Sequence, residues 1–212
     1  MQHISKERAG ALSDGVIAIA ATILVLELKV PEDHSLSRSD IEAWGLLFLG
    51  WVVSFVMIAI IWLDNHRLIS LAPVLTYSMM LLTFTQLAMV SLIPFSCDLV
   101  MDQPDNLEAA MAFISIMLIN GVCSGLGGLL VARDLRSHGE QTLAVKLGRR
   151  SLVQILIYAL TALTALLSAI LHHPFIAVGL WVFMPLLVWF WLDKVDGPMG
   201  ATTHNSKAKQ DS

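Results

Sequence analysis

The sequence has few charged residues and only two cysteines. Charged side chains make up 14% of the 212 residues and hydrophobic ones 56%, whereas an ordinary soluble domain is about a quarter charged. With a mean hydropathy of +0.72, the chain is expected to have the lipid bilayer as its solvent. Cys97 and Cys123 stand alone, without metal-site spacing or a disulfide framework. We interpret both as small apolar residues.

The chain also lacks a strong excess of charge of one sign. Its formal net charge is −4, so neither a nucleic-acid partner nor an acidic substrate is indicated. No low-complexity segment and no internal duplication of the first span stands out. We therefore expect one membrane domain over residues 1–196, followed by a polar, disordered cytoplasmic tail over residues 197–212.

Long apolar runs dominate the rest of the sequence. Six are long enough to cross a bilayer, which takes about 20 helical residues; they cover residues 9–28, 43–63, 74–95, 109–132, 152–171 and 174–192. The first is too long for the apolar core of a cleaved secretory signal. The sequence thus predicts an all-α integral membrane protein with six transmembrane helices, the last two forming a tight hairpin.

Lysine and arginine are almost absent from one side of this predicted topology. Lys29 and Arg38 alone lie in the first, third and fifth loops, and all others lie in the N-terminal segment, the second and fourth loops and the C-terminal segment. The positive-inside rule then predicts cytoplasmic termini in the cell (inner) membrane. The opposite loops are acidic, which would attract cations, although a merely solvated surface explains them equally well.

Polar residues interrupt the start of the first apolar run. Arg8, Ser13 and Asp14 occur in the stretch ERAGALSDG. An ionised Asp in a membrane helix is costly unless it faces protein or water and finds partners, which makes Asp14 a candidate functional residue. A structural role, in which polar side chains pin two helices together, is the leading alternative.

Partners for Asp14 are available in the second run. The stretch IIWLDNHRL places Trp62, Asn65 and His66 near the same cytoplasmic face. His66 could accept or donate a hydrogen bond toward Asp14, and Trp62 fits an interfacial anchor.

An apolar stripe follows these polar residues along the first run. Ile19, Ile23 and Leu26 recur at positions i, i+4 and i+7, with Thr22 beside them. Small alanines on the neighbouring faces permit close helix packing. Any membrane helix offers such a stripe, so on its own it indicates only contact with lipid or with a protein core.

Two motifs raise the significance of that stripe. The stretch RAGALSDGVIAIAATILVL resembles the first-helix signature of the transmembrane protein 175 family of potassium channels, R-x3-F-S-D, and WLDNH resembles that family's Trp and Asn-His pattern in the second helix. Arg8, Ser13 and Asp14 match the signature, and Leu12 stands where the family has Phe. The resemblance covers the whole six-span layout.

The resemblance implies a homotetramer in which the first helix of each subunit lines a central pore. It places a hydrophobic constriction at Ile19, with Ile23 and Leu26 along the same face, and Thr22 where some bacterial relatives have a ring of hydroxyl groups. The implied partners are further copies of the chain, the lipid bilayer and monovalent cations, with permeant K⁺ and no bound cofactor. The chain lacks a Thr-Val-Gly-Tyr-Gly filter, so we expect modest selectivity for potassium over sodium.

The polar residues near the cytoplasmic face receive a separate role. We expect a network that holds the first helix against its neighbours and does not coordinate the ion; it comprises Arg8, Ser13, Asp14, Trp62, Asn65 and His66.

Two other function classes compete with a channel. A proton-coupled transporter or a proton leak could use Asp14 and His66, but the sequence lacks an ionisable residue near the membrane centre and paired broken helices. A membrane enzyme would need a nucleophile, base or metal ligands gathered in one place, which the sequence does not offer. The cluster NGVCSGLGG has no Lys-Ser/Thr after it and is not a phosphate loop; we interpret Gly121 and Gly125 as a close-packing face.

Overall fold

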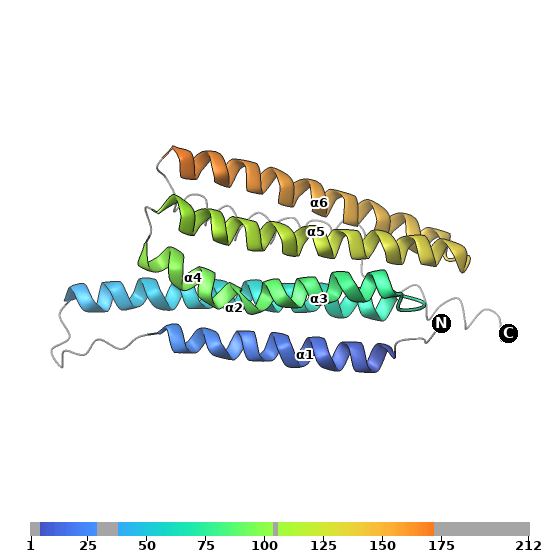
Figure 1. Cartoon of the computed structure of the whole chain (residues 1–212), viewed down its shortest axis with the longest axis horizontal. Coiled ribbons are helices and arrows are strands. Elements are labelled where there is room, and N and C mark those ends of the chain that lie inside the picture. Colours follow the sequence, from blue (N-terminus) through green and yellow to red (C-terminus); the bar gives the residue numbers. More distant parts are fainter. Residues whose placement is uncertain (1–4, 29–37, 104–105, 172–212) are drawn as a thin grey trace.

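The computed structural model describes residues 5–28, 38–103 and 106–171, and within these ranges its only regular secondary structure is helical. Figure 1 shows the helices lying side by side along one axis. They are α1 (Lys6–Ile23), the 3₁₀ segment η1 (Leu24–Glu27), α2 (Arg38–Leu71), α3 (Tyr77–Ser91), α4 (Ile93–Asp102), α5 (Leu107–Ser137) and α6 (Gln141–Ile170).

The described residues contain five stretches that are long and apolar enough to cross a membrane. These stretches are Lys6–Leu26, Leu47–Leu71, Tyr77–Asp102, Leu107–Ser137 and Gln141–Ser168. They correspond to the first five spans expected from the sequence, so the prediction of an all-α membrane protein is confirmed. The sixth expected span, residues 174–192, its hairpin with the fifth and the tail from residue 197 lie outside the described residues.

The third membrane stretch consists of two helices. Thr76 caps the start of α3: its side chain accepts a hydrogen bond from the Met79 backbone N–H at 3.3 Å, a regular N-cap. The chain turns at Leu92, and Pro94 stands in the first turn of α4, where proline is tolerated because no intrahelical N–H bond is lost.

The helices extend further than the apolar runs that predicted them. α2 continues to Leu71, beyond the expected end at residue 63, and α6 begins at Gln141, well before the expected residue 152. The expected loop over residues 133–150 is therefore only a short turn, in which Gly139 adopts φ +87°. Hydropathy locates the apolar part of a helix, whereas the backbone hydrogen bonds continue through polar turns at the membrane boundary.

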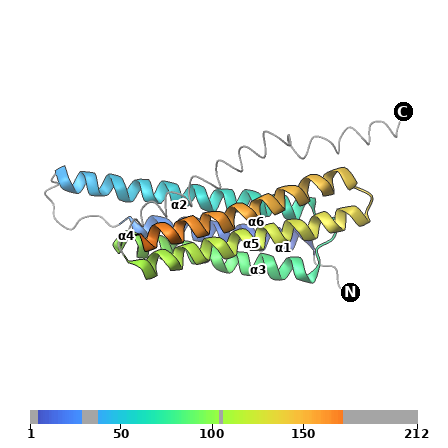
Figure 2. The same cartoon turned by 90° about the horizontal axis from the view of Figure 1, so that it is seen from above.

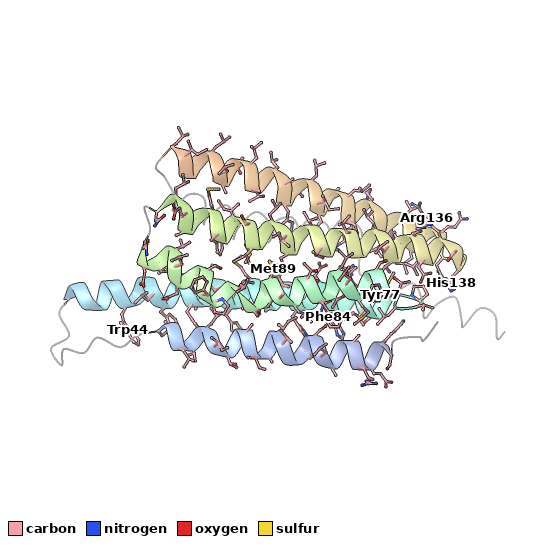
Figure 3. The ribbon with its side chains drawn as sticks, in the orientation of Figure 1. Trp44, Tyr77, Phe84, Met89, Arg136 and His138 are labelled. Atoms are coloured by element: carbon pink, nitrogen blue, oxygen red, sulfur yellow. The ribbon has the colours of Figure 1, made fainter. Side chains whose placement is uncertain are left out.

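Consecutive long helices run in opposite directions, which gathers the basic residues at one end. Figures 1 and 2 show the α5–α6 turn at the end of the bundle where α1 begins and α2 finishes. Arg136 and His138 lie at this end, and Trp44 lies at the opposite end (Figure 3).

α5 is the most central helix of the bundle. It packs against α2, α3, α4 and α6, while α1 packs chiefly against α2 and α3. Three glycines of α5 allow α6 to approach closely: a Cβ atom would overlap Tyr158 at Gly121, Ile155 at Gly125 and Ser151 at Gly128. The close-packing face expected at Gly121 and Gly125 is thus confirmed.

Candidate functional site

α1 has one face buried in the bundle and one that the chain leaves uncovered. The buried face follows the helical repeat through Ala9, Ser13, Ile17 and Ala20. The uncovered face carries the stripe of Ile19, Ile23 and Leu26, which are 61%, 42% and 73% exposed. We call these three residues the pore stripe, after the role that the resemblance of the sequence predicts for them. Such a row of bulky apolar side chains must meet lipid or other protein.

Thr22 lies beside the pore stripe and is also exposed. Its hydroxyl group donates a hydrogen bond to the Ile19 carbonyl oxygen at 2.9 Å. Because the single hydroxyl proton is used within the helix, the oxygen is left with lone pairs available to an outside group. Thr22 can therefore act as an oxygen ligand.

The helix changes form within the pore stripe. α1 ends at Ile23, and Leu24–Glu27 form the 3₁₀ segment η1, closed by the Leu28 backbone N–H donating to the Val25 carbonyl oxygen at 3.2 Å. Leu24 is 2% exposed, whereas Leu26 is 73% exposed. This segment therefore has one side in the core and one in the pore stripe.

Asp14 is bonded to the second helix through tryptophan. Its Oδ1 atom accepts a hydrogen bond from the indole Nε1–H of Trp62 at 2.7 Å, and the Trp62 ring stacks on His66 with centroids 5.4 Å apart. The structure thus brings Asp14, Trp62 and His66 together. The residue that hydrogen-bonds to Asp14 is Trp62, whereas the sequence suggested His66. Trp62 lies one helical turn before His66, and Asp14 and His66 share no hydrogen bond among the described residues.

The other residues of the expected network lie elsewhere. Ser13 is buried, and its hydroxyl donates to the Ala9 carbonyl oxygen of its own helix at 3.0 Å. Asn65 is also buried and faces a small cavity shared with α3 and α5. Arg8 is exposed and has no ion pair within the described part of the chain. The structure therefore does not bring Arg8 or Asn65 to Asp14.

An open hollow of about 220 Å³ lies between α1 and α2, next to Asp14 and Trp62. Its lining includes three small residues, Ala18, Ala21 and Ala59. None of the three pore-stripe residues lines this hollow, which therefore lies on another side of α1.

A second polar cluster connects three helices, and sequence reasoning did not find it. Ser124 of α5 donates to Asp64 of α2, and Gln154 Nε2 of α6 lies 3.2 Å from Asp64 Oδ2 and 3.0 Å from Ser124 Oγ. Gln86 and Asn120 likewise join α3 to α5 through a buried hydrogen bond of 3.2 Å. The only signal in the sequence was that polar residues recur within apolar runs; their partners depend on which helices are neighbours.

Comparison with known proteins places this arrangement in context. The family described as "Endosomal/lysosomal potassium channel TMEM175" matches residues 8–94. A protein named a potassium channel from a Chryseobacterium strain is 25% identical over 90% of this chain and 95% of its own length. Another so named, from Chamaesiphon minutus, is 34% identical over 52% of this chain and 58% of its own length.

The fold is also similar to a solved structure. A crystal structure titled as a lysosomal potassium-selective channel TMEM175 homolog from Chamaesiphon minutus superimposes with a TM-score of 0.71. The match covers 89% of this chain and 98% of that one at 22% identity. At this identity the match shows a shared fold.

Proposed function

We propose, because this chain belongs to the TMEM175 family, that it is a potassium-permeable cation channel in which four copies surround a central pore lined by α1. The observation that carries this proposal is the pore stripe, which the single chain leaves uncovered although it is apolar. One stripe cannot enclose a pathway, so several copies around an axis are required.

The pore stripe supplies the constriction. Rings of Ile19, Ile23 and Leu26 narrow the path until water leaves it, and the pore then conducts only when these rings rewet. Ion passage of this kind is passive transport and involves no catalysis. Gradient-driven flux therefore needs no cofactor beyond the permeating K⁺.

A ring of four Thr22 hydroxyl groups, one from each copy, supplies the selectivity of the pore. Its oxygens carry free lone pairs because each hydroxyl proton is bonded to Ile19, so four of them can replace part of a cation's hydration shell. A single layer of hydroxyl oxygens discriminates less than stacked carbonyl rings. We therefore expect only modest preference for potassium over sodium.

The polar network positions α1 and stays outside the ion path. Asp14 is held by Trp62, which joins α1 to α2 near the basic end of the bundle. The lysines and arginines of that end support a multi-pass protein of the cell (inner) membrane, with this end and both termini cytoplasmic. Six spans, of which the described residues supply five, complete each subunit.

The alternative, a proton-coupled transporter or proton leak through Asp14 and His66, finds less support. The group between them is the Trp62 indole, which can only donate a hydrogen bond and cannot pass a proton onward. The channel proposal needs no such relay.

Flux of potassium into liposomes containing the purified protein tests the proposal. Ile23→Asn makes the constriction polar, so gradient-driven flux should rise well above that of the native chain. The matched control is Leu156→Asn, a polar change at an exposed leucine of α6, which should leave flux unchanged. Equal flux in all three proteins, or flux only with a proton gradient, would contradict a channel gated by the pore stripe.

A further inference from the structure

A small cavity of about 20 Å³ lies where α2, α3 and α5 meet. On α2 its lining consists of Asn65, Leu68, Ile69 and Ala72, which recur at positions i, i+3, i+4 and i+7 and therefore share one face of the helix. The side chain of Asn65 thus lies on the face of α2 that borders the cavity. None of the residues that line the cavity carries a formal charge, so its interior is suited to an uncharged molecule.

Asn65 brings an unpaired amide group to this cavity. The residue is only 3% exposed, and its side chain makes no hydrogen bond within the described part of the chain. The amide is nevertheless not among the described groups that are both unpaired and completely covered, as Asn120 Nδ2 is. Its polar atoms therefore keep accessible surface. Because the residue is otherwise enclosed and lies on the cavity face, this surface faces the cavity.

α3 supplies two hydrogen-bond acceptors to the same cavity. Gln86 is 4% exposed and donates through Nε2 to Asn120 Oδ1 at 3.2 Å, which leaves its Oε1 atom as a free acceptor. The Thr83 hydroxyl group donates its proton to the Met79 carbonyl oxygen at 3.0 Å, which leaves lone pairs on Oγ1. Thr83 and Gln86 both line the cavity, about one helical turn apart.

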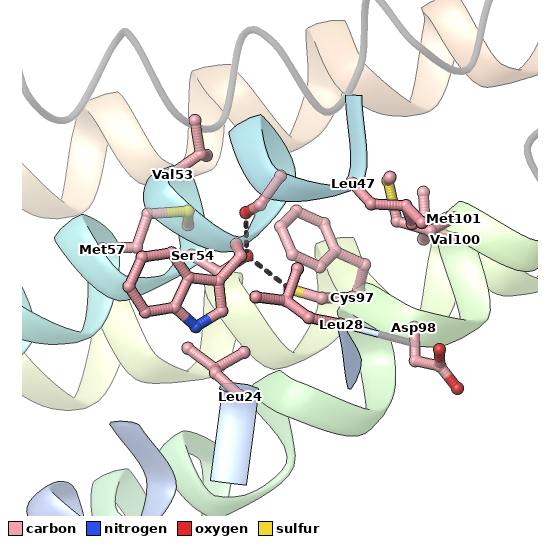
Figure 4. A pocket seen from close by; sticks show the side chains of 13 residues that line it. Leu24, Leu28, Leu47, Val53, Ser54, Met57, Cys97, Asp98, Val100 and Met101 are labelled. Carbon is pink, nitrogen blue, oxygen red and sulfur yellow. Dashed lines mark hydrogen bonds between the residues drawn. The ribbon is translucent and has the colours of Figure 1, made fainter. Parts of the chain in front are cut away.

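A larger cavity of about 90 Å³ under η1 shows the contrast. Figure 4 shows that its lining is almost wholly apolar and that the Asp98 carboxylate points away from it. The Ser54 hydroxyl group there already has partners in the Gly50 carbonyl oxygen at 2.9 Å and in Cys97 Sγ at 3.2 Å (Figure 4). The smaller cavity is therefore the one in which open donors and acceptors converge.

We propose that the cavity between α2, α3 and α5 binds one water molecule, which accepts a hydrogen bond from Asn65 Nδ2 and donates to Gln86 Oε1 and Thr83 Oγ1. A buried water needs roughly 10–15 Å³ and two to four polar partners, and the cavity of about 20 Å³ meets both requirements. The water removes the cost of an unpaired amide inside the membrane. It enters from the basic end of the bundle, because Asn65 lies within about 9 Å of the end of α2 at Leu71.

This water completes the polar contacts of a single turn of α2. Trp62 bonds to Asp14 of α1, and Asp64 bonds to Ser124 of α5. Asn65 adds α3 through the water, since a water-mediated bond is nearly as favourable as a direct one. One turn of α2 is thus joined to each of its neighbours by a different side chain. The site does not depend on the channel proposal.

Labelled asparagine makes this water visible in the native chain. The asparagines are Asn65, Asn106, Asn120 and Asn205, so isotope-labelled asparagine gives few side-chain amide signals, and single substitutions assign them. In solid-state NMR of the full chain in lipid bilayers, magnetisation that starts on water should reach the Asn65 amide several-fold faster than the Asn120 amide. Asn120 is the internal control, because its Nδ2 atom is completely covered.

A double-mutant cycle measures the bridge between α2 and α3. Asn65 and Thr83 share no direct hydrogen bond among the described residues, so coupling between Asn65→Leu and Thr83→Val has to pass through a bridging group. It should change the unfolding equilibrium constant in detergent about threefold. The matched control is Thr85→Val, because Thr85 donates to the Leu81 carbonyl oxygen at 3.0 Å, as Thr83 does to Met79, but does not line the cavity. Its effect should add to that of Asn65→Leu.

Two results would each overturn the proposal. The first is transfer from water to the Asn65 amide that is no faster than transfer to Asn120. The second is strictly additive effects of Asn65→Leu and Thr83→Val. Coupling without water transfer would show a direct contact between the two side chains and would also overturn it. The transfer measurement uses the native chain, so it decides the question even if Asn65→Leu does not fold.

Discussion

Trp62→Phe isolates the contact that joins α1 to α2. The phenyl ring keeps the apolar contact and the stacking on His66, while the N–H donor to Asp14 disappears. The substitution therefore removes one hydrogen bond with little other change. We expect the free energy of unfolding in detergent to fall by about 1 kcal/mol.

This magnitude follows from the geometry of the bond. Hydrogen bonds between membrane helices contribute ~0.6 kcal/mol on average and at most ~1.7, and bonds to a charged acceptor are roughly twice as strong as neutral ones. The 2.7 Å distance to Asp14 favours the upper half of the range. Exposure of Asp14 lowers the value again, because solvent screens the carboxylate.

A double-mutant cycle with Asp14→Ala measures the bond itself. If Trp62 and Asp14 act through one hydrogen bond, the double variant should be no more than slightly less stable than either single variant, with a coupling energy of about 1 kcal/mol. His66→Phe serves as the control, because it keeps an aromatic stack on Trp62 and should leave the coupling intact. Additive losses in the Trp62 and Asp14 variants would refute the reasoning.

Two further predictions follow from α5 and from the pore. Gly125→Ala should destabilise the protein by about 1–3 kcal/mol, because the new Cβ overlaps Ile155 and approaches a backbone oxygen of α6. The control is Gly127→Ala, whose Cβ meets only Leu68 at 3.6 Å and which should be neutral or stabilising by up to ~1 kcal/mol. Equal stability of the two variants in thermal unfolding would contradict close packing at this face. Thr22→Val keeps the shape of the side chain but loses its oxygen, so the potassium-to-sodium permeability ratio from reversal potentials should fall toward one while conduction persists; an unchanged ratio would remove Thr22 from the selectivity ring.

The sequence predicts features that depend on a single helix better than those that depend on two. The apolar runs indicated all five of the spans in the described residues. The spacing of Ile19, Ile23 and Leu26 was enough to place these three residues on one face. In contrast, the partner of Asp14 depends on the depth and rotation of α2 relative to α1, so spacing alone could not choose Trp62 over His66.

The same limit explains the polar cluster on the other side of α2. Asp64, Ser124 and Gln154 are 60 and 30 residues apart in sequence, and they meet only because α5 lies between α2 and α6. Helix ends were also misplaced, since hydropathy reports on side chains and the helix of α6 depends on backbone bonds that begin at Gln141.

The 3₁₀ segment at the end of α1 sets the angular position of the last residue of the stripe. A 3₁₀ helix advances 120° and 2.0 Å per residue, against 100° and 1.5 Å in an α-helix. Three steps from Ile23 to Leu26 therefore make a full turn and place the two side chains in line. Rewinding Leu24–Glu27 into α-helix would swing Leu26 by about 60° around the axis and draw it back by roughly 1.5 Å. A change of helical pitch over one turn thus moves Leu26 from the line of Ile23 to within about 20° of the line of Ile19, while Ile19 and Ile23 stay where they are.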